Sequence, residues 1–426
     1  MRRKTLLLLS FVAILFVTAC SSSSTSNGKG LEELTVWAWD PSFNIKALEM
    51  AEEEYKAEHP DFKLNIIENA QDDIIQKLNT TLSSGSTKGL PNIVLIEDYR
   101  AKSFLEAYPG SFYELTDKFD TSDFIPYKIA ATSIEDKNYA IPFDTGSTGL
   151  YVRTDLLEQA GYTVEDLQNI DWNQYIEIGK DVKEATGKKL ITNNHNDLGI
   201  LRIMMQSSGT WYTEEDGVTT NIANNEALKI AFKVYKDLVD EDLMNVHSDW
   251  SQQIQALNSG KVASIPIGNW ITPSIKAEES QTGDWAVAPI PSLPGMEESV
   301  HASNLGGASW YVLNIEGKEE AVDFLTTTFS SNVDFYQELV SEVGAIGTYI
   351  PGTEGKAYKA KDDYFGGQAI YEDFTNWSKE IPEVNYGMNT YAIEDIIIVA
   401  MQKYLQGGDL DTILETAQEQ AEKQIR

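Results

Sequence analysis

Charged side chains stand directly after predicted strands in the first third of the chain, and their types define the chemistry that they could perform. A carboxylate accepts two hydrogen bonds at once from neighbouring hydroxyl groups, and a charged acceptor bonds more strongly than a neutral one. Such residues suit the binding of a polar ligand. In a chain with 66 acidic residues, a solvated surface carboxylate is the alternative for each of them. The candidates here are Asp40, Glu97, Asp98, Arg100 and Asp144.

The elements that must position these residues alternate between strand and helix. The predicted strands span 34–39, 62–67 and 93–96, and the predicted helices span 44–58 and 72–84. The third strand is wholly apolar, which indicates burial on both faces and is typical of a doubly wound α/β sheet. In such sheets, ligands collect in the crevice beyond the carboxyl ends of the strands. Asp40 and Glu97 stand at two of those ends.

The rest of the chain is predicted to hold a second group of strands and many helices. A strand at 139–144 leads past Gly146 and Gly149 into a strand at 150–153, and these glycines suit a chain that crosses between two lobes. Further strands are predicted at 263–267, 285–291 and 308–313, and helices near 171–186, 195–208, 225–240 and 249–259. The remainder of the chain is predicted to be helical, up to a last amphipathic helix through Leu410 and Ala417. No internal repeat is present, which disfavours a solenoid or a propeller.

The order of these segments resembles the family 1 extracellular solute-binding proteins, the maltose-binding-protein-like receptors of ABC sugar importers. The residues that carry the resemblance are 34–39, 91–96, 139–143, 150–161, 268–270, 306–307 and 391–392. The resemblance extends over nearly the whole chain after its first 30 residues. One departure is Tyr151-Val152-Arg153, where members of the family often have a Tyr followed by Asn or Asp.

The resemblance implies an α/β, two-lobed periplasmic-binding-protein-like fold of type II. Each lobe is then a mixed sheet flanked by helices, and a hinge that the chain crosses several times joins the lobes. We expect the amino-terminal lobe at 31–144 plus 304–329 and the carboxyl-terminal lobe at 145–303 plus 330–426. Ligand then binds in the cleft and stabilises a closed form that a membrane permease recognises.

A sugar presents hydroxyl edges and flat C–H faces, so its pocket needs carboxylates, amides and aromatic rings. Tryptophan suits a half-wet cleft, because it combines a large apolar area with one donor. Six tryptophans that fall near predicted strand ends or loops are candidates, with core packing as the alternative for each: Trp37, Trp39, Trp250, Trp270, Trp310 and Trp377. Trp39 and Trp270 are favoured, because each follows a strand at a position where the family builds its cleft, whereas Trp310 lies inside an apolar strand and is expected in the core. The second-lobe polar candidates, again by position in the family, are Asn196, Asp197, Asn269, Asn385 and Tyr391.

The amino terminus predicts export and lipidation. Arg2, Arg3 and Lys4 precede an apolar run from Leu6 to Val17, which is too short for a stable membrane span and is typical of a secretory signal peptide at residues 1–19. The sole cysteine, Cys20, follows this run in a pattern that resembles a bacterial lipobox, so we expect cleavage before Cys20 and its acylation. An incidental cysteine beside an uncleaved anchor is the alternative. Residues 20–30 then form a lipidated, Ser-rich flexible tether on the extracellular face of the cell membrane.

Composition excludes several classes of partner. The chain carries a net charge of −33, and removal of the three positive charges before Cys20 makes it −36. Nucleic acid is therefore not expected as a partner, and the acidic surface disfavours direct binding to anionic lipid. No disulfide can form within a monomer once the only cysteine is acylated.

Enzyme and metal motifs are absent from the sequence. The four histidines are isolated, and neither a zinc motif, a GxSxG nucleophile elbow nor a GxxxxGK phosphate loop occurs. An adjacent Tyr-Tyr pair, which would suit ferric ion, is also absent. We expect no cofactor, no metal and no catalytic residue. The expected function is that of a monomeric, lipid-anchored receptor that delivers an oligosaccharide to an ABC permease. A receptor for a peptide or polyamine and a surface glycan hydrolase are the alternatives.

Overall fold

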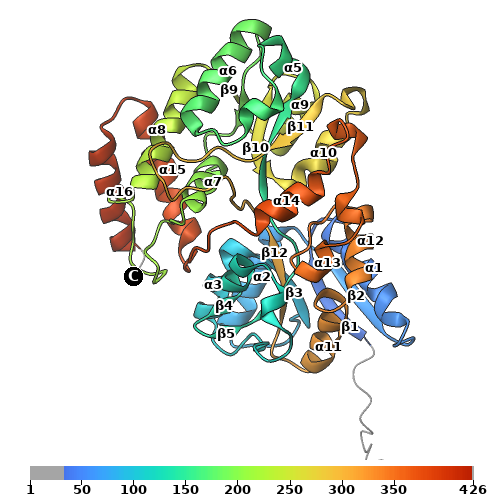
Figure 1. The fold of residues 1–426 in the computed structure, drawn as a ribbon. Helices are drawn as coiled ribbons and strands as arrows, with labels where there is room; N and C mark the ends of the chain where they lie inside the picture. Colours follow the sequence, from blue (N-terminus) through green and yellow to red (C-terminus); the bar gives the residue numbers. More distant parts are fainter. Residues whose placement is uncertain (1–32, 425–426) are drawn as a thin grey trace, which may run out of the picture.

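The computed structural model describes residues 33–424, and the predicted signal peptide, Cys20 and tether lie outside the described residues. The described chain forms two lobes, each with its own sheet and flanking helices (Figure 1). The first lobe is built on a five-stranded sheet in the order β2-β1-β3-β12-β6. Its strands are β1 (Glu33–Ala38), β2 (Lys63–Glu68), β3 (Ile93–Glu97), β12 (Ala308–Val312) and β6 (Ala140–Pro142).

This sheet is mixed and buried on both faces. Strand β1 runs parallel to β2 and β3, whereas β12 is antiparallel to β3 and β6. Alternation along β3 sends Ile93 and Leu95 into one core and Val94 and Ile96 into another, because successive strand residues point to opposite faces. Trp310, on β12, is fully buried as predicted.

Helices cover the two faces of this sheet. On one face pack α1 (Asn44–Lys56), α11 (Lys318–Phe329) and α12 (Val333–Val343), and on the other pack α2 (Gln71–Ser83) and α3 (Asp98–Ala107). The short helices α4 (Pro126–Ala131) and α13 (Ile350–Thr353) and the hairpin β4 (Ser133–Ile134) and β5 (Lys137–Asn138) complete this lobe.

The second lobe is built on an antiparallel sheet in the order β10-β7-β11. Its strands are β7 (Thr148–Arg153), β10 (Ser264–Gly268) and β11 (Trp285–Ala288), and a parallel pair, β8 (Ile191–Asn193) and β9 (Met244–Val246), lies beside β10. Its helices are α5 (Thr154–Gln159), α6 (Trp172–Thr186), α7 (Gly199–Ser207), α8 (Glu226–Asp240), α9 (Trp250–Asn258), α10 (Thr272–Lys276), α14 (Ile370–Ser378), α15 (Thr390–Leu405) and α16 (Leu410–Gln424).

The chain passes between the lobes three times, and the three crossings lie side by side. Bridges pair Ser147 with Asn304 and Asp144 with Gly347, so the segments near 144–147, 304 and 347 form a narrow ribbon between the sheets. This is the multi-crossing hinge that the sequence predicted.

Several predicted elements differ from those observed. Helix α12 was expected in the second lobe, but Phe335 and Leu339 are buried in the core of the first lobe, against α1. The helix predicted at 195–208 begins at Gly199, because Asp197 Oδ1 accepts a hydrogen bond from the Gly199 amide at 2.7 Å. Strands β8 and β9 were not predicted, since three residues are too few to show alternation.

Candidate ligand-binding cleft

A cleft of about 1000 Å³ lies between the two lobes. The first lobe lines it with residues that follow β1, with the last residue of β3 and with the carboxyl-terminal end of α12. The second lobe lines it with residues of α7, α9 and α14 and of the β10 to α10 connection. Six of the ten predicted ligand-binding residues belong to this lining: Trp39, Asp40, Glu97, Asp144, Asp197 and Trp270.

Aromatic rings from both lobes face this space. Trp39 and Phe43 come from the first lobe, and Trp250, Trp270 and Tyr371 come from the second. The rings of Trp250 and Trp270 lie 5.8 Å apart with an angle of 41° between their planes. Trp250 is 49 % exposed, so much of this aromatic pair is accessible to a ligand. Broad apolar faces beside polar groups are the surface that a sugar ring requires.

The position of Trp270 is fixed by the second hinge crossing. Its Nε1 donates a hydrogen bond to the carbonyl of Leu305 at 2.7 Å. Gly268 makes this approach sterically feasible, because a Cβ there would lie 2.2 Å from Trp270 Nε1 and 2.6 Å from the Leu305 carbonyl. The motif Gly268-Asn269-Trp270 thus couples a cleft tryptophan to the backbone that joins the lobes.

Asp40 lies in the turn between β1 and α1, where its backbone has a φ of +56°. Aspartate tolerates this left-handed conformation better than most residues, because its side chain hydrogen-bonds to nearby amides. Asp40 Oδ1 accepts from the Ser42 amide at 3.0 Å, and the carboxylate is exposed at the cleft. This turn therefore presents an acceptor beside Trp39.

Glu97, the last residue of β3, is the centre of a polar contact between the lobes. It accepts hydrogen bonds from the hydroxyl of Tyr391 and from Gln71 Nε2, the latter at 3.3 Å. Burial raises the pKa of the Glu97 carboxyl, whereas the charges of Arg202 and Arg100 and the hydrogen bond from Tyr391 act in the opposite direction. Glu97 thus lines the cleft as a partly buried and already hydrogen-bonded acceptor.

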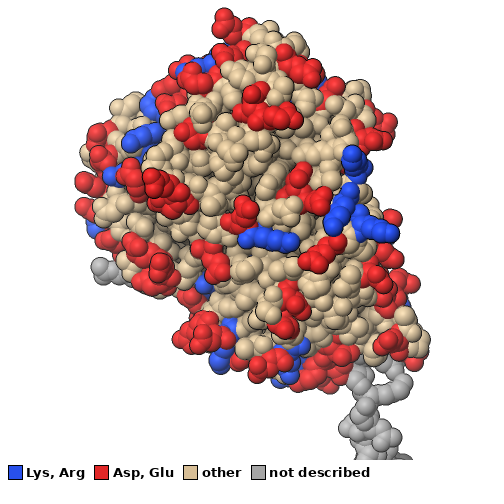
Figure 2. Space-filling model, in the orientation of Figure 1, with Lys and Arg blue, Asp and Glu red and all other residues tan. Residues whose placement is uncertain are grey.

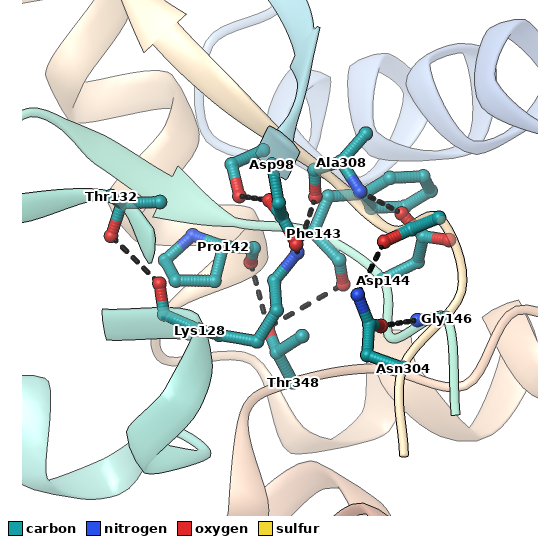
Figure 3. Close-up of polar contacts among 12 residues, drawn as sticks. Asp98, Lys128, Thr132, Pro142, Phe143, Asp144, Gly146, Asn304, Ala308 and Thr348 are labelled. Atoms are coloured by element: carbon teal, nitrogen blue, oxygen red, sulfur yellow. Dashed lines mark hydrogen bonds and ion pairs between the residues drawn. The ribbon is translucent and has the colours of Figure 1, made fainter. Parts of the chain in front are cut away.

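Asp144 lies where the chain first leaves the first lobe (Figure 3). Its Oδ1 accepts from the Ala308 amide at 3.0 Å, which ties the first crossing to the start of β12. Burial raises the pKa of the Asp144 carboxyl to about 7, and the negative charge of Asp98 adds to this, whereas the Lys128 ammonium lowers it. Asp144 therefore changes its charge near neutral pH at the base of the cleft.

Asp98 does not face the cleft, contrary to the sequence prediction. Its side chain is fully buried, and its Oδ2 accepts from Lys128 Nζ at 2.6 Å while Ser309 Oγ donates to its Oδ1 at 3.2 Å (Figure 3). Glu97 and Asp98 follow one another at a strand end, and such neighbours point to opposite sides. Asp98 thus anchors α4 to the sheet of the first lobe.

Three further candidates lie beside the cleft without lining it. Arg100 stacks on the ring of Tyr391, with its guanidinium carbon 3.6 Å from the ring centre. Asn269 is buried, and within the described residues neither polar atom of its amide has a hydrogen-bond partner. These three side chains, Arg100, Asn269 and Tyr391, therefore contact a ligand only if the lobes move or if a water molecule bridges the gap.

Sequence reasoning missed Arg202, which lines the cleft from α7. Arg202 pairs with the buried Glu394 through two hydrogen bonds, one from Nε to Oε1 at 2.6 Å and one from Nη2 to Oε2. Its guanidinium also lies 4.8 Å from the ring centre of Tyr99. The signal for this residue was a lone arginine within an otherwise apolar helix. Gln71, Phe43, Leu305 and Tyr371 of the lining were likewise not predicted.

Within residues 33–424, His, Cys, Asp and Glu side chains form no group of three or more that could hold a metal ion. In the same part of the chain, no helix is long and apolar enough to span a membrane.

Two lobes with separate sheets, a narrow ribbon of crossings and a lined cleft between them define a two-lobed solute-binding protein. The sequence matches the family described as bacterial extracellular solute-binding protein over residues 51–363. It is 45 % identical to a lactose-binding protein of Rhizobium radiobacter, over 92 % of this chain and 93 % of that protein. The chain belongs to this family of bacterial extracellular solute-binding proteins.

More distant similarities agree with this assignment. The chain is 24 % identical to a maltooligosaccharide ABC transporter solute-binding lipoprotein of Streptococcus pneumoniae, over 88 % of this chain and 86 % of that protein. Its fold is similar to that of an ABC transporter associated binding protein from B. animalis subsp. lactis, solved in complex with β-1,6-galactobiose. The TM-score for that pair is 0.73 at 23 % identity, with 92 % of this chain and 97 % of that chain covered. This last similarity concerns the fold alone.

Proposed function

We propose that the chain is the substrate-binding component of an ABC sugar importer and that it binds a neutral oligosaccharide in the cleft between its lobes. The observation that carries this proposal is the cleft itself, in which Trp250 and Trp270 stand opposite the turn that presents Trp39 and Asp40. Aromatic faces stack on sugar rings, and carboxylates accept from their hydroxyl groups. The 45 % identity to a lactose-binding protein supports a disaccharide as the first ligand to test.

Nine of the ten predicted residues serve the ligand in this proposal. Trp39, Asp40, Glu97, Asp144, Asp197 and Trp270 contact it in the cleft, and Arg100, Asn269 and Tyr391 meet it when the lobes close. Asp98 supports the first lobe. We place the lobe boundaries at the three crossings, near residues 144–147, 303–308 and 344–349, about which the lobes rotate.

The protein works as a monomer tethered through acylated Cys20, with the permease subunits of the importer as its partners, and it catalyses nothing. Its tether keeps it at the extracellular face of the membrane. Replacement of Cys20 by Ala is expected to release the protein into the medium, whereas Ser21→Ala leaves it in the membrane fraction. Immunoblotting of the two fractions measures this, and an unchanged distribution of the Cys20→Ala protein argues against lipidation.

Titration of the full chain in detergent tests the binding function. Intrinsic tryptophan fluorescence and calorimetry are measured with lactose, galactobiose, maltooligosaccharides and arabinooligosaccharides, with a polyamine and short peptides alongside. Binding of one glycan class near micromolar, roughly 8 kcal/mol, is expected of a reversible transport receptor. A response to the polyamine or peptides alone would favour a non-sugar receptor, and glycan cleavage products after incubation would favour a hydrolase.

A further inference from the structure

The charged residues that line the cleft are mostly acidic. Among the described residues, its lining includes the acids Asp40, Glu97, Asp144, Asp197 and Glu342 and the cations Arg202 and Lys276. Acidic side chains also dominate the visible face of both lobes (Figure 2). A ligand that enters this cleft therefore approaches a negative surface. An anionic ligand can form an ion pair with the lining only if Arg202 or Lys276 is not already paired with a carboxylate.

Lys276 is already paired with a carboxylate of its own lobe. Its Nζ donates to Asp362 Oδ2 at 2.6 Å. The Asp362 side chain is only 15 % exposed, and its Oδ1 accepts from the Tyr364 amide at 3.0 Å, so the carboxylate is held in place from its other side. The Lys276 ammonium is thus neutralised by a positioned partner.

Arg202 is paired more completely. Both of its hydrogen bonds to Glu394 come from one edge of the guanidinium, and Glu394 also accepts from the Tyr212 hydroxyl at 3.1 Å. The rings of Tyr99 and Tyr391 lie 4.8 and 5.2 Å from the guanidinium carbon. A ligand carboxylate would have to compete with this buried carboxylate to bind Arg202.

We propose that this cleft admits uncharged glycans and excludes those that carry a carboxylate, because Asp362 and Glu394 neutralise both cations of the lining. An anionic ligand would give up its hydration without gaining a free cation of the lining, and it would be repelled by Asp40, Asp197 and Glu342, for which the described residues supply no ion pair. Arg100, beside the lining, already has carboxylate oxygens of Glu97 and Asp72 at 3.9 Å. Asp362 and Glu394 are therefore positioning residues that determine which ligand charge the cleft accepts, although neither lines the cleft. This inference rests on the proposed function.

Three matched ligands test the proposal with the full chain in detergent at pH 7.5 and low salt. These are lactose, the lactose derivative whose galactose C6 is a carboxylate, and the methyl ester of that derivative. We expect the acid to bind at least tenfold more weakly than lactose and the ester to bind within about threefold of lactose. We also expect the difference to shrink as salt screens the repulsion. The proposal fails if the acid binds as tightly as lactose, or if the ester is rejected as strongly as the acid.

A pair of variants tests the role of Asp362. Asp362→Asn keeps the acceptor for the Tyr364 amide but leaves Lys276 without its carboxylate partner. The penalty against the acid, which is the ratio of its dissociation constant to that of lactose, should therefore fall several-fold. The affinity for lactose should change less than twofold. Asp363→Asn removes an exposed neighbouring carboxylate outside the lining and should leave the penalty unchanged. Equal penalties in the two variants would overturn the role of Asp362.

The outcomes also separate this inference from the function on which it rests. If the acid binds and lactose does not, the charge selection is wrong but a sugar receptor stands. If neither these glycans nor the wider panel bind, the proposed function fails and the charge selection falls with it. Melting temperatures of both variants show whether they fold, and the comparison of the three ligands needs no variant.

Discussion

The hydroxyl of Tyr391, at the start of α15 in the second lobe, donates a hydrogen bond to the carboxylate of Glu97, at the end of β3 in the first lobe. Arg100 stacks on the same tyrosine ring from the first lobe. Two residues further along α3, Lys102 Nζ donates to Asn385 Oδ1 at 2.8 Å. The lobes are therefore joined at one side of the cleft by side chains as well as by the three crossings.

Replacement of Tyr391 by Phe should weaken this contact while keeping the ring beneath Arg100. A hydrogen bond to a charged acceptor contributes about 1.5 kcal/mol or more, so we expect a loss of that order in the free energy of unfolding. The hydrogen bond from Tyr391 is also one of the contacts that lower the pKa of Glu97, so its loss raises that pKa further. Urea denaturation at pH 8 measures the loss of stability.

The matched control is Tyr113→Phe, because the Tyr113 hydroxyl has no hydrogen bond to the described residues. This variant should unfold within about 0.5 kcal/mol of the wild type. If both variants behave alike, the Glu97 contact between the lobes contributes no stability.

Replacement of Trp250 by Ala should weaken oligosaccharide binding about tenfold, which corresponds to roughly 1.4 kcal/mol. The ring is 49 % exposed beside Trp270, so its removal costs ligand stacking more than core packing. The melting temperature should change little. Calorimetric titration with the best glycan measures the effect, and Val246→Ala, an exposed residue of β9 outside the lining, is the control. An unchanged affinity for Trp250→Ala would place the sugar elsewhere in the cleft.

The raised pKa of Asp144 predicts a pH dependence of stability. Since this pKa is raised from 3.8 to about 7, the folded protein keeps a proton between about pH 4 and pH 7 that the unfolded chain has released. The free energy of unfolding therefore falls as pH rises through this window, by about 1.4 kcal/mol for each pKa unit. Asp144→Asn keeps the acceptor for the Ala308 amide but removes the titrating group.

We therefore expect the stability of Asp144→Asn, relative to the wild type, to increase as pH rises from 4 to 7 and to stay level above pH 7. Urea denaturation across pH 4 to 9 measures this, and Asp136→Asn, which changes an exposed carboxylate of the same lobe, is the control. A stability difference that does not vary with pH would mean that Asp144 ionises in the folded protein as it does in the unfolded chain.

The sequence predicts most of the first sheet, because local patterns specify it. The apolar strand 93–96 and the alternation of strands and helices before it correspond to β1, α1, β2, α2 and β3. The placement of α12 could not be predicted in this way. Its spacing shows a helix with one apolar face, but only tertiary contacts decide which of two cores that face joins.

The sequence predicts those cleft residues that stand at the ends of predicted strands. Asp40 and Glu97 stand at strand ends and line the cleft, whereas Asp98, one residue further, is buried against Lys128. Neighbouring residues at a strand end point in opposite directions, and the type of residue does not show which of the two faces the cleft. Arg202 escaped prediction because its partner Glu394 lies 192 residues away in the sequence.

The buried amide of Asn304 holds two of the hinge crossings together. Its Oδ1 accepts from the Tyr127 hydroxyl and from the Gly146 amide, both at 3.1 Å. Its Nδ2 donates to the Gly306 carbonyl at 2.8 Å and to the hydroxyl of Tyr386, from the second lobe, at 3.4 Å. Asn304 thus joins both lobes and two crossings, and it needs a donor and an acceptor at once.

Asn304→Asp should destabilise the protein strongly, because a carboxylate keeps the acceptor but places a second oxygen against the Gly306 carbonyl. An unsatisfied buried polar group and a desolvated charge together cost about 3 kcal/mol. Asn314→Asp makes the same chemical change at an exposed site, where Nδ2 donates to the Gly110 carbonyl at 3.0 Å, and should cost less than 1 kcal/mol. Urea denaturation compares the two. Equal losses would show that the hinge tolerates a missing donor, and lobe rotation would then have to be controlled by the backbone crossings alone.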